Sequence, residues 1–224
     1  GAMLVRKGHA AGMVAGSNSP TADVLRAAIH VVGTKPGLKT VSSSMIMITN
    51  TPEYGENGVL IFGDCGVIPK PTSEQLADIA ISSAEKARSL VDIKEPKVAM
   101  LSFSTYGSAS SEDVTRVQEA VEILKSRNVD FKFGGELQFD AAVVPEVSRK
   151  KAPNSEVKGE ANILIFPDLG AGNIGYKIAQ RLAKAEALGP LIQGLAKPIH
   201  DLSRGCSVQD IVNVAAITAV ESEL

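Results

Sequence analysis

Short apolar runs alternate with amphipathic segments along the whole chain, and this alternation is the pattern of an α/β fold. Buried or β-rich runs predict strands over residues 12–16, 41–49, 59–62, 97–103 and 162–166. Helical spacing predicts helices over residues 21–29, 72–90, 112–127, 175–187 and 211–220. The run at 162–166 is apolar after its first residue, Asn162, so we expect a central parallel strand, and ligand crevices usually lie at the carboxyl end of such a strand.

Local signals refine three of these elements. The pair Asn57-Gly58 favours a tight hairpin, so the strands at 41–49 and 59–62 are predicted to be antiparallel. The sequence Thr72-Ser73-Glu74-Gln75 fits a capping box at a helix start. The glycine-rich segment 170–175 is interpreted as a strand-to-helix turn that would present backbone amides to a phosphate. It lacks the Gly-Lys-Ser/Thr ending of a nucleotide-binding P-loop.

The chain divides most naturally near Gly37 and Gly189. These boundaries would make residues 38–189 one α/β domain. Residues 1–37 and 190–224 would then share a second α/β domain.

Composition excludes several classes of protein. The 224 residues carry a formal net charge of −2 and no strongly basic half, so a nucleic-acid partner is not expected. No apolar run approaches the ~18 residues of a membrane span, and the first residues lack the layout of a signal peptide. Two cysteines and three scattered histidines indicate neither a disulfide framework nor a metal site. We therefore expect a soluble, cytoplasmic protein without a metal.

The segment 190–214 carries the most informative chemistry of the chain. Arg204 offers a planar fork that matches phosphate oxygens, Ser203 a neutral hydroxyl, and Asp210 a carboxylate in the first turn of the following helix. An anion site with a proton acceptor beside it is the chemistry of a transferase.

Each candidate also has a plain structural interpretation. Asp210 and Ser207 have the spacing of a helix cap, and from spacing alone the cap is favoured. Ser203 and Arg204 would then be ordinary surface residues of a turn. Arg181 and Arg26 would be solvated charges on helices.

Six segments in the same order resemble the phosphate acetyltransferase family. They are Gly1–Gly8, Thr21–Arg26, Phe62–Cys65, Ala99–Thr105, Phe166–Leu169 with Gly172-Asn173, and Asp201–Gly205. The resemblance implies reversible transfer of an acetyl group between coenzyme A and inorganic phosphate, in a cleft between two α/β domains. It also implies a homodimer, with coenzyme A and acetyl phosphate as ligands and no prosthetic group.

The resemblance assigns roles to single residues. Asp210 is implied to remove the coenzyme A thiol proton, Arg204 to hold the phosphate, and Ser203 to donate to a reacting oxygen. The anionic ligand site would also contain Arg181, Arg26, Thr21 and Asn173. His200 stands where asparagine is expected in the family, which questions the loop hydrogen bond of that position.

One departure from the family is large. The stretch like Gly1–Gly8 lies well inside the first domain of family members, so the first domain is expected to be present here only in part, and the transferase activity of residues 1–224 alone to be weak or absent. Two rival functions stay open: a phosphate butyryltransferase, which would differ in the room around the acyl carbon, and a catalytically silent domain that senses acetyl-CoA.

Overall fold

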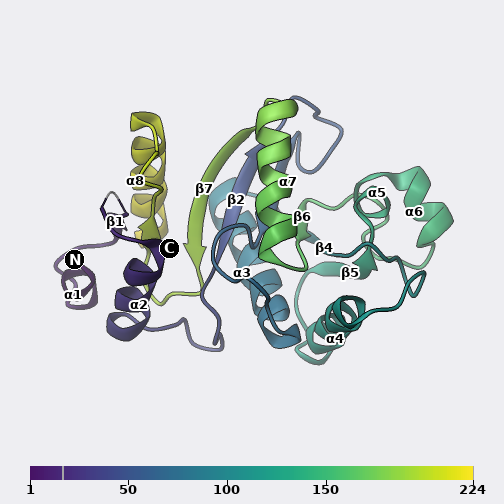
Figure 1. Cartoon of the computed structure of the whole chain (residues 1–224), viewed down its shortest axis with the longest axis horizontal. Coiled ribbons are helices and arrows are strands. Elements are labelled where there is room, and N and C mark those ends of the chain that lie inside the picture. Colours follow the sequence, from purple (N-terminus) through teal and green to yellow (C-terminus); the bar gives the residue numbers. More distant parts are fainter. Residues whose placement is uncertain (17, 224) are drawn as a thin grey trace.

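The computed structural model describes residues 1–16 and 18–223 (Figure 1). Its strands are β1 (Met13–Ala15), β2 (Ser42–Ile48), β3 (Val59–Gly63), β4 (Lys97–Leu101), β5 (Lys132–Leu137), β6 (Ile163–Ile165), β7 (Glu186–Gln193) and β8 (Ile199–Asp201). Its helices are α1 (Ala2–Arg6), α2 (Thr21–Val31), α3 (Ser73–Val91), α4 (Glu112–Ser126), α5 (Phe139–Val143), α6 (Pro145–Lys151), α7 (Leu169–Leu182) and α8 (Val208–Ser222). The predicted α/β class is confirmed.

Six strands form one mixed sheet in the order β5-β4-β6-β3-β2-β7. Strand β6 is parallel to both of its neighbours, β3 and β4, as the run 162–166 predicted. Strand β2 is antiparallel to β3, and a two-residue turn with positive φ at Asn57 and Gly58 leads into β3. The Asn-Gly signal is therefore confirmed.

The two faces of this sheet carry separate apolar layers because alternate residues of a strand point to opposite sides. Ile46 of β2 packs with the buried faces of α3 and α4, whereas its neighbours Met45 and Met47 pack on the other side, where α5 and α7 lie. Figure 1 shows α3 behind the sheet and α7 in front of it. The capping box at Thr72 and Gln75 is confirmed at the start of α3.

A second sheet contains only β1 and β8, which run parallel with Ala15 opposite Asp201. Helix α2 packs beside this pair, where Val24 and Ala28 share an apolar cluster with Ile199 of β8. Figure 1 shows this group at the opposite end of the molecule from α5 and α6. The carboxyl ends of β1 and β8 therefore meet at one edge, from which α2 and the segment 202–207 depart.

The region around α7 and β7 corrects the sequence-based interpretation. The helix predicted over residues 175–187 begins earlier, at Leu169, and ends at Leu182, so the glycine-rich segment 170–175 is helical rather than a turn. The Asp168 carboxylate accepts a hydrogen bond from the Ala171 amide and caps the helix. Gly172 permits close packing, because a Cβ there would lie 2.4 Å from the Asp64 carbonyl oxygen.

Residues 186–193 form a strand, β7, that the sequence did not predict. The composition Glu-Ala-Leu-Gly-Pro gives no strand signal, and the ladder to β2 overrides this weak local preference. The boundary predicted near Gly189 falls inside this strand. In the described part of the chain, no helix combines the length and apolarity needed to span a bilayer.

Candidate functional site

Ser203 and Arg204 lie on the exposed segment that connects β8 to α8. The Ser203 hydroxyl oxygen accepts a hydrogen bond from the Gly205 amide at 3.2 Å, and the Cys206 amide donates to the Ser203 carbonyl at 3.0 Å. These bonds turn the chain so that both side chains are exposed. Across residues 1–16 and 18–223 the Arg204 guanidinium makes no ion pair, and its five N–H donors are open to a ligand.

Asp210 lies in the first turn of α8 and forms a capping box with Ser207. The Ser207 amide donates to the Asp210 carboxylate at 2.8 Å, and the Asp210 amide donates to the Ser207 hydroxyl at 3.1 Å. The helix-cap interpretation of Asp210 is confirmed. An ionised carboxylate has about four acceptor positions, so the cap leaves acceptor capacity for a proton, and the role of Asp210 as a base stays a prediction.

Thr21 is the one candidate from another element that contacts this edge. It begins α2, and its hydroxyl donates a 2.5 Å hydrogen bond to the carboxylate of Asp201, the last residue of β8. Asp201 precedes Ser203 by two residues, so the contact brings the start of α2 to the start of the Ser203–Arg204 segment. The sequence placed Asp201 in a family motif but gave it no role.

Arg26 lies on the exposed face of α2, one turn beyond Thr21. Its guanidinium pairs with Asp23 at 2.8 Å, and the side chains are 66% and 55% exposed. This geometry is that of a solvated helix pair, which contributes about 0.3 to 0.5 kcal/mol. Arg26 as a ligand residue stays a prediction.

Asn173 and Arg181 both lie on α7, on the six-stranded sheet. The Asn173 amide donates to the Cys65 carbonyl at 3.2 Å and joins α7 to the end of β3. Arg181 is exposed in the last turn of the same helix. Figure 1 shows α7 and α8 separated by β7, and within the described residues no hydrogen bond joins these two side chains to the 203–210 segment. The structure therefore groups the candidates at one edge in a limited sense. Ser203, Arg204 and Asp210 lie on the chain that leaves β8, Thr21 joins the start of that chain through Asp201, and Asn173 and Arg181 lie apart on α7.

A cavity of about 1060 Å³ lies elsewhere, between α4 and the segment at Tyr106 and Gly107. Its floor contains the buried carboxylate of Glu136, which accepts hydrogen bonds from Ser104, Gly107 and Gln118. Burial opposes ionisation of Glu136, but these donors hold its pKa below the usual range. Glu136 thus has a full set of structural partners, and none of the candidate residues lines this cavity.

Cys65 is buried at the end of β3. Burial, and then the nearby charge of Asp64, raises the pKa of the Cys65 thiol far above its usual range. A thiol that stays protonated is a poor nucleophile, which agrees with the packing role expected of this cysteine.

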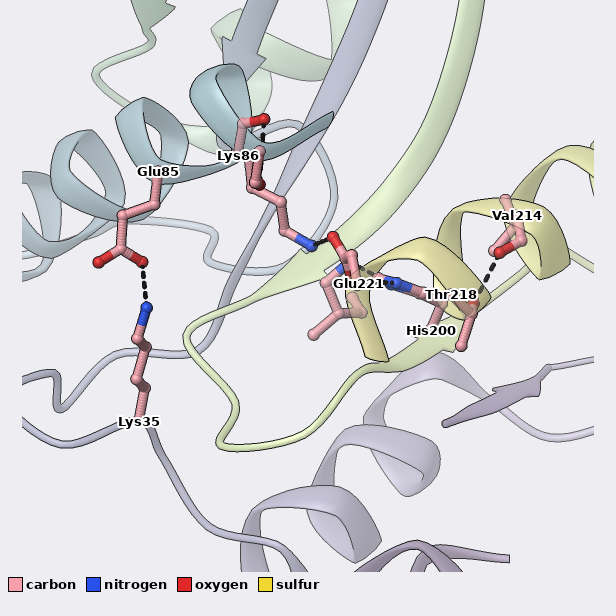
Figure 2. A network of polar contacts seen from close by, with 9 residues as sticks. Lys35, Glu85, Lys86, His200, Val214, Thr218 and Glu221 are labelled. Carbon is pink, nitrogen blue, oxygen red and sulfur yellow. Dashed lines mark hydrogen bonds and ion pairs between the residues drawn. The ribbon is translucent and has the colours of Figure 1, made fainter. Parts of the chain in front are cut away.

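A buried network fixes the far end of α8 (Figure 2). Lys86 of α3 pairs with Glu221 of α8, whose second oxygen lies 2.9 Å from His200 Nε2 on β8. The Ile192 amide donates to His200 Nδ1 at 3.0 Å, so the ring proton is on Nε2 and is donated to Glu221. His200 thus joins β7, β8 and α8 through its two ring nitrogens.

Burial determines the direction of the pKa shift for two members of this network. It lowers the pKa of Lys86 and of His200, against the opposing effect of Glu221. Burial alone would raise the pKa of Glu221, but the hydrogen bond from His200 and the charge of Lys86 bring it below the usual range. The only sign of this network in the sequence is weak, since Lys86 is a charged residue beside the buried positions Ala84 and Ala87 of a helix.

Replacing Lys86 with methionine is expected to lower the free energy of unfolding by about 3 kcal/mol, because Glu221 would keep its buried charge and lose its cation. Lys35→Met is the matched control, since Lys35, from the segment between α2 and β2, forms an exposed pair with Glu85 of α3 that contributes at most about 1 kcal/mol. Urea denaturation of both variants measures the difference. Equal losses would show that the buried pair does not anchor α8.

The chain matches the family model described as phosphate acetyl/butaryl transferase over residues 1–219. It is 56% identical over 224 residues to the phosphate acetyltransferase of Treponema pallidum, covering 99% of this chain and 66% of the relative. The phosphate acetyltransferase of Clostridium acetobutylicum is 56% identical over 221 residues, with the same 99% and 66% coverage.

Solved structures agree with these relatives. A phosphotransacetylase from Streptococcus pyogenes superposes with a TM-score of 0.93 at 48% identity, covering 100% of this chain and 66% of that one. A branched-chain phosphotransacylase from Enterococcus faecalis shares the fold, with a TM-score of 0.77 at 21% identity, over 99% of this chain and 77% of that one. The chain spans about two thirds of the length of the curated relatives it matches. The family match over residues 1–219 and the identity to these relatives show that the chain belongs to the phosphate acetyl/butaryl transferase family.

Proposed function

We propose that the protein transfers an acetyl group between coenzyme A and inorganic phosphate. The single observation that supports this most is the grouping of Thr21, Ser203, Arg204 and Asp210 at the carboxyl edge of β1 and β8, in a member of this family. Arg204 can donate hydrogen bonds to an anion and Asp210 has a carboxylate, and both lie within one short segment. The names of the relatives favour acetyl transfer over transfer of longer acyl groups.

The mechanism is direct transfer with both substrates bound together. Asp210 accepts the thiol proton of coenzyme A, and the thiolate attacks the acetyl carbonyl of acetyl phosphate. The S–C bond forms while the C–O bond to phosphate breaks, and the phosphate leaves with the bonding electron pair. Arg204 balances the negative charge of the leaving phosphate, and Ser203 donates a hydrogen bond to a reacting oxygen. Holding the two reactants side by side supplies several kcal/mol of the rate enhancement.

Asp210 needs a change of surroundings to act in this way. In this structure the carboxylate is partly exposed and accepts a hydrogen bond from the Ser207 amide. Closure of a cleft over the bound ligands would bury the carboxylate beside the thiol. The scheme requires no metal or prosthetic group, and coenzyme A enters as a substrate.

The arrangement of the chain around this site follows the same proposal. We infer two α/β domains, residues 38–189 and the combination of 1–37 with 190–224. The separate two-stranded sheet of β1 and β8 supports a second domain, whereas β7 carries residues 190–193 into the six-stranded sheet. We also infer a homodimer that acts in the cytoplasm, where Cys65 and Cys206 stay reduced thiols. Arg26, Arg181 and Asn173 would join the ligand site when the domains close.

The test is an assay of the purified full-length protein with acetyl phosphate and coenzyme A, in which the absorbance of the thioester product is measured over time. Formation of acetyl-CoA that requires both substrates is the expected result. Butyryl phosphate is the matched comparison, and faster turnover of butyryl than of acetyl would replace the acetyl assignment with the butyryl one. Binding of acetyl-CoA without any transfer would instead support the sensing domain.

A further inference from the structure

Asp201 is a buried carboxylate whose hydrogen bonding is incomplete. The residue is 2% exposed, and among the described residues its side chain accepts one hydrogen bond, from the Thr21 hydroxyl to Oδ2. Its Oδ1 is buried and has no hydrogen-bond partner among the described residues. Leaving a buried acceptor unpaired costs about 1 to 3 kcal/mol, so such a group calls for an explanation.

Comparison with Asp64 shows what a purely structural buried aspartate looks like in this fold. Asp64 is 3% exposed and also follows a strand end, but its two oxygens accept bonds from the amides of Ser43, Gly66, Val67 and Ile68 and from the Ser43 hydroxyl. Those bonds fold the segment 64–68 and account for the residue. Asp201 folds no such segment, because among the described residues the only hydrogen bond to its carboxylate comes from the hydroxyl that begins α2.

The backbone makes room for the free oxygen. Gly16, which follows β1, has a φ of +112°, and a Cβ there would lie 2.5 Å from Asp201 Oδ1 and 2.1 Å from the Leu202 carbonyl oxygen. Any larger residue would clash with both atoms. Thus the carboxylate sits tightly between the segments that leave β1 and β8, at the edge where Ser203 and Arg204 begin.

A carboxylate at this position determines the direction of the Thr21 hydroxyl. An asparagine of the same size has a donor of its own, whereas an ionised carboxylate only accepts. The proton of Thr21 is therefore held by Asp201, and the lone pairs of Thr21 Oγ1 are what a ligand meets. The start of α2 favours the ionised form, since a helix amino terminus stabilises negative charge. Burial acts in the other direction and raises the pKa of Asp201.

We propose that Asp201 is a positioning residue that orients Thr21 to accept a hydrogen bond from the thiol arm of coenzyme A. The inference rests on the proposed function, and it follows from the chemistry of its two ligands. Dianionic acetyl phosphate has only acceptors, which the acceptor face of Thr21 would not bind. The thiol arm of coenzyme A carries a thiol S–H and amide N–H groups, which are donors. Thr21 thus binds coenzyme A and not acetyl phosphate, which Arg204 and Ser203 bind.

The test measures the Kd of coenzyme A by calorimetry in the full-length protein, so that the readout does not depend on turnover. Asp201→Asn and Thr21→Val are each expected to raise this Kd by about three- to tenfold, the contribution of one hydrogen bond. The double variant is expected to bind no more weakly than the weaker single variant, because both changes act through one hydroxyl. Thr21→Ser keeps the hydroxyl and is the matched control, expected to bind within about twofold of the unaltered protein.

Steady-state kinetics separates positioning from a loss of fold. The KM for coenzyme A should rise in both variants, while the KM for acetyl phosphate stays nearly unchanged. Thr21→Val is expected to lower the melting temperature, because it leaves the buried Asp201 carboxylate without its donor, and Thr21→Ser should keep the melting temperature nearly unchanged. Losses that multiply in the double variant, or equal increases for both substrates, would overturn the inference. An unaltered protein that binds coenzyme A but transfers no acetyl group would overturn the proposed function alone, whereas failure to bind coenzyme A would overturn both.

Discussion

Replacing Asp210 with asparagine in the full-length protein is expected to lower turnover by about two to four orders of magnitude. Asparagine keeps the size and one acceptor oxygen for the Ser207 amide, so the cap of α8 is largely retained. What it loses is the ability to take a proton from the thiol. The loss should become smaller as rising pH ionises the thiol of free coenzyme A, and a pH series of kcat measures this recovery.

Ser207→Ala is the matched control for this experiment. It removes the hydroxyl that accepts from the Asp210 amide but leaves the carboxylate in place. Its expected cost is about 1 kcal/mol of stability, with turnover nearly intact. An Asp210→Asn protein that melts early and turns over normally would show that Asp210 only caps the helix.

Replacing Arg204 with glutamine is expected to reduce kcat/KM for acetyl phosphate and phosphate by roughly 30- to 1,000-fold, or about 2 to 4 kcal/mol. Arg204 is exposed, so its side chain contributes little to folding, and glutamine keeps the polarity of the turn. The loss reflects the missing charge-assisted contact with the phosphate. Kinetics with each phosphate substrate, together with a melting curve, measures it.

A surface arginine provides the control for the change of charge. Arg149 on α6 is 69% exposed and lies 4.0 Å from Glu146, far along the chain from the candidate segment. Arg149→Gln should leave both the kinetics and the melting temperature nearly unchanged. If Arg204→Gln behaves in the same way, Arg204 is not part of the site.

Elements with strong local signals could be predicted from the sequence. The apolar run 162–166 is β6 with parallel neighbours, and the capping box at Thr72 and Gln75 begins α3. The Asn57-Gly58 turn leads into β3 as expected. Each of these signals operates over a few residues, through side-chain hydrogen bonds or backbone conformation. Strand β7 has no such signal, because its stability comes from the ladder to β2, more than 130 residues earlier.

The same distinction between local signals and long-range contacts applies to the candidate site. Ser203, Arg204 and Asp210 could be found because they lie within one short segment, and the cap of α8 could be predicted from the spacing of Ser207 and Asp210. The contribution of α7 could not be judged in this way. Asn173 and Arg181 are distant in sequence from the segment, and their positions depend on how two sheets are arranged.

By itself the sequence determined the α/β class, the hairpin, the two capping boxes and the segment that carries the chemistry, because all of these depend on neighbours along the chain. Only the tertiary structure decided that Asp201 holds the hydroxyl of Thr21, 180 residues earlier, and that Lys86 and His200 meet at Glu221. In both cases the energetics depend on burial, since a carboxylate or an ammonium group has little effect in water and a large one where water is excluded. Burial is a property of packing between distant segments, which the order of residues does not display.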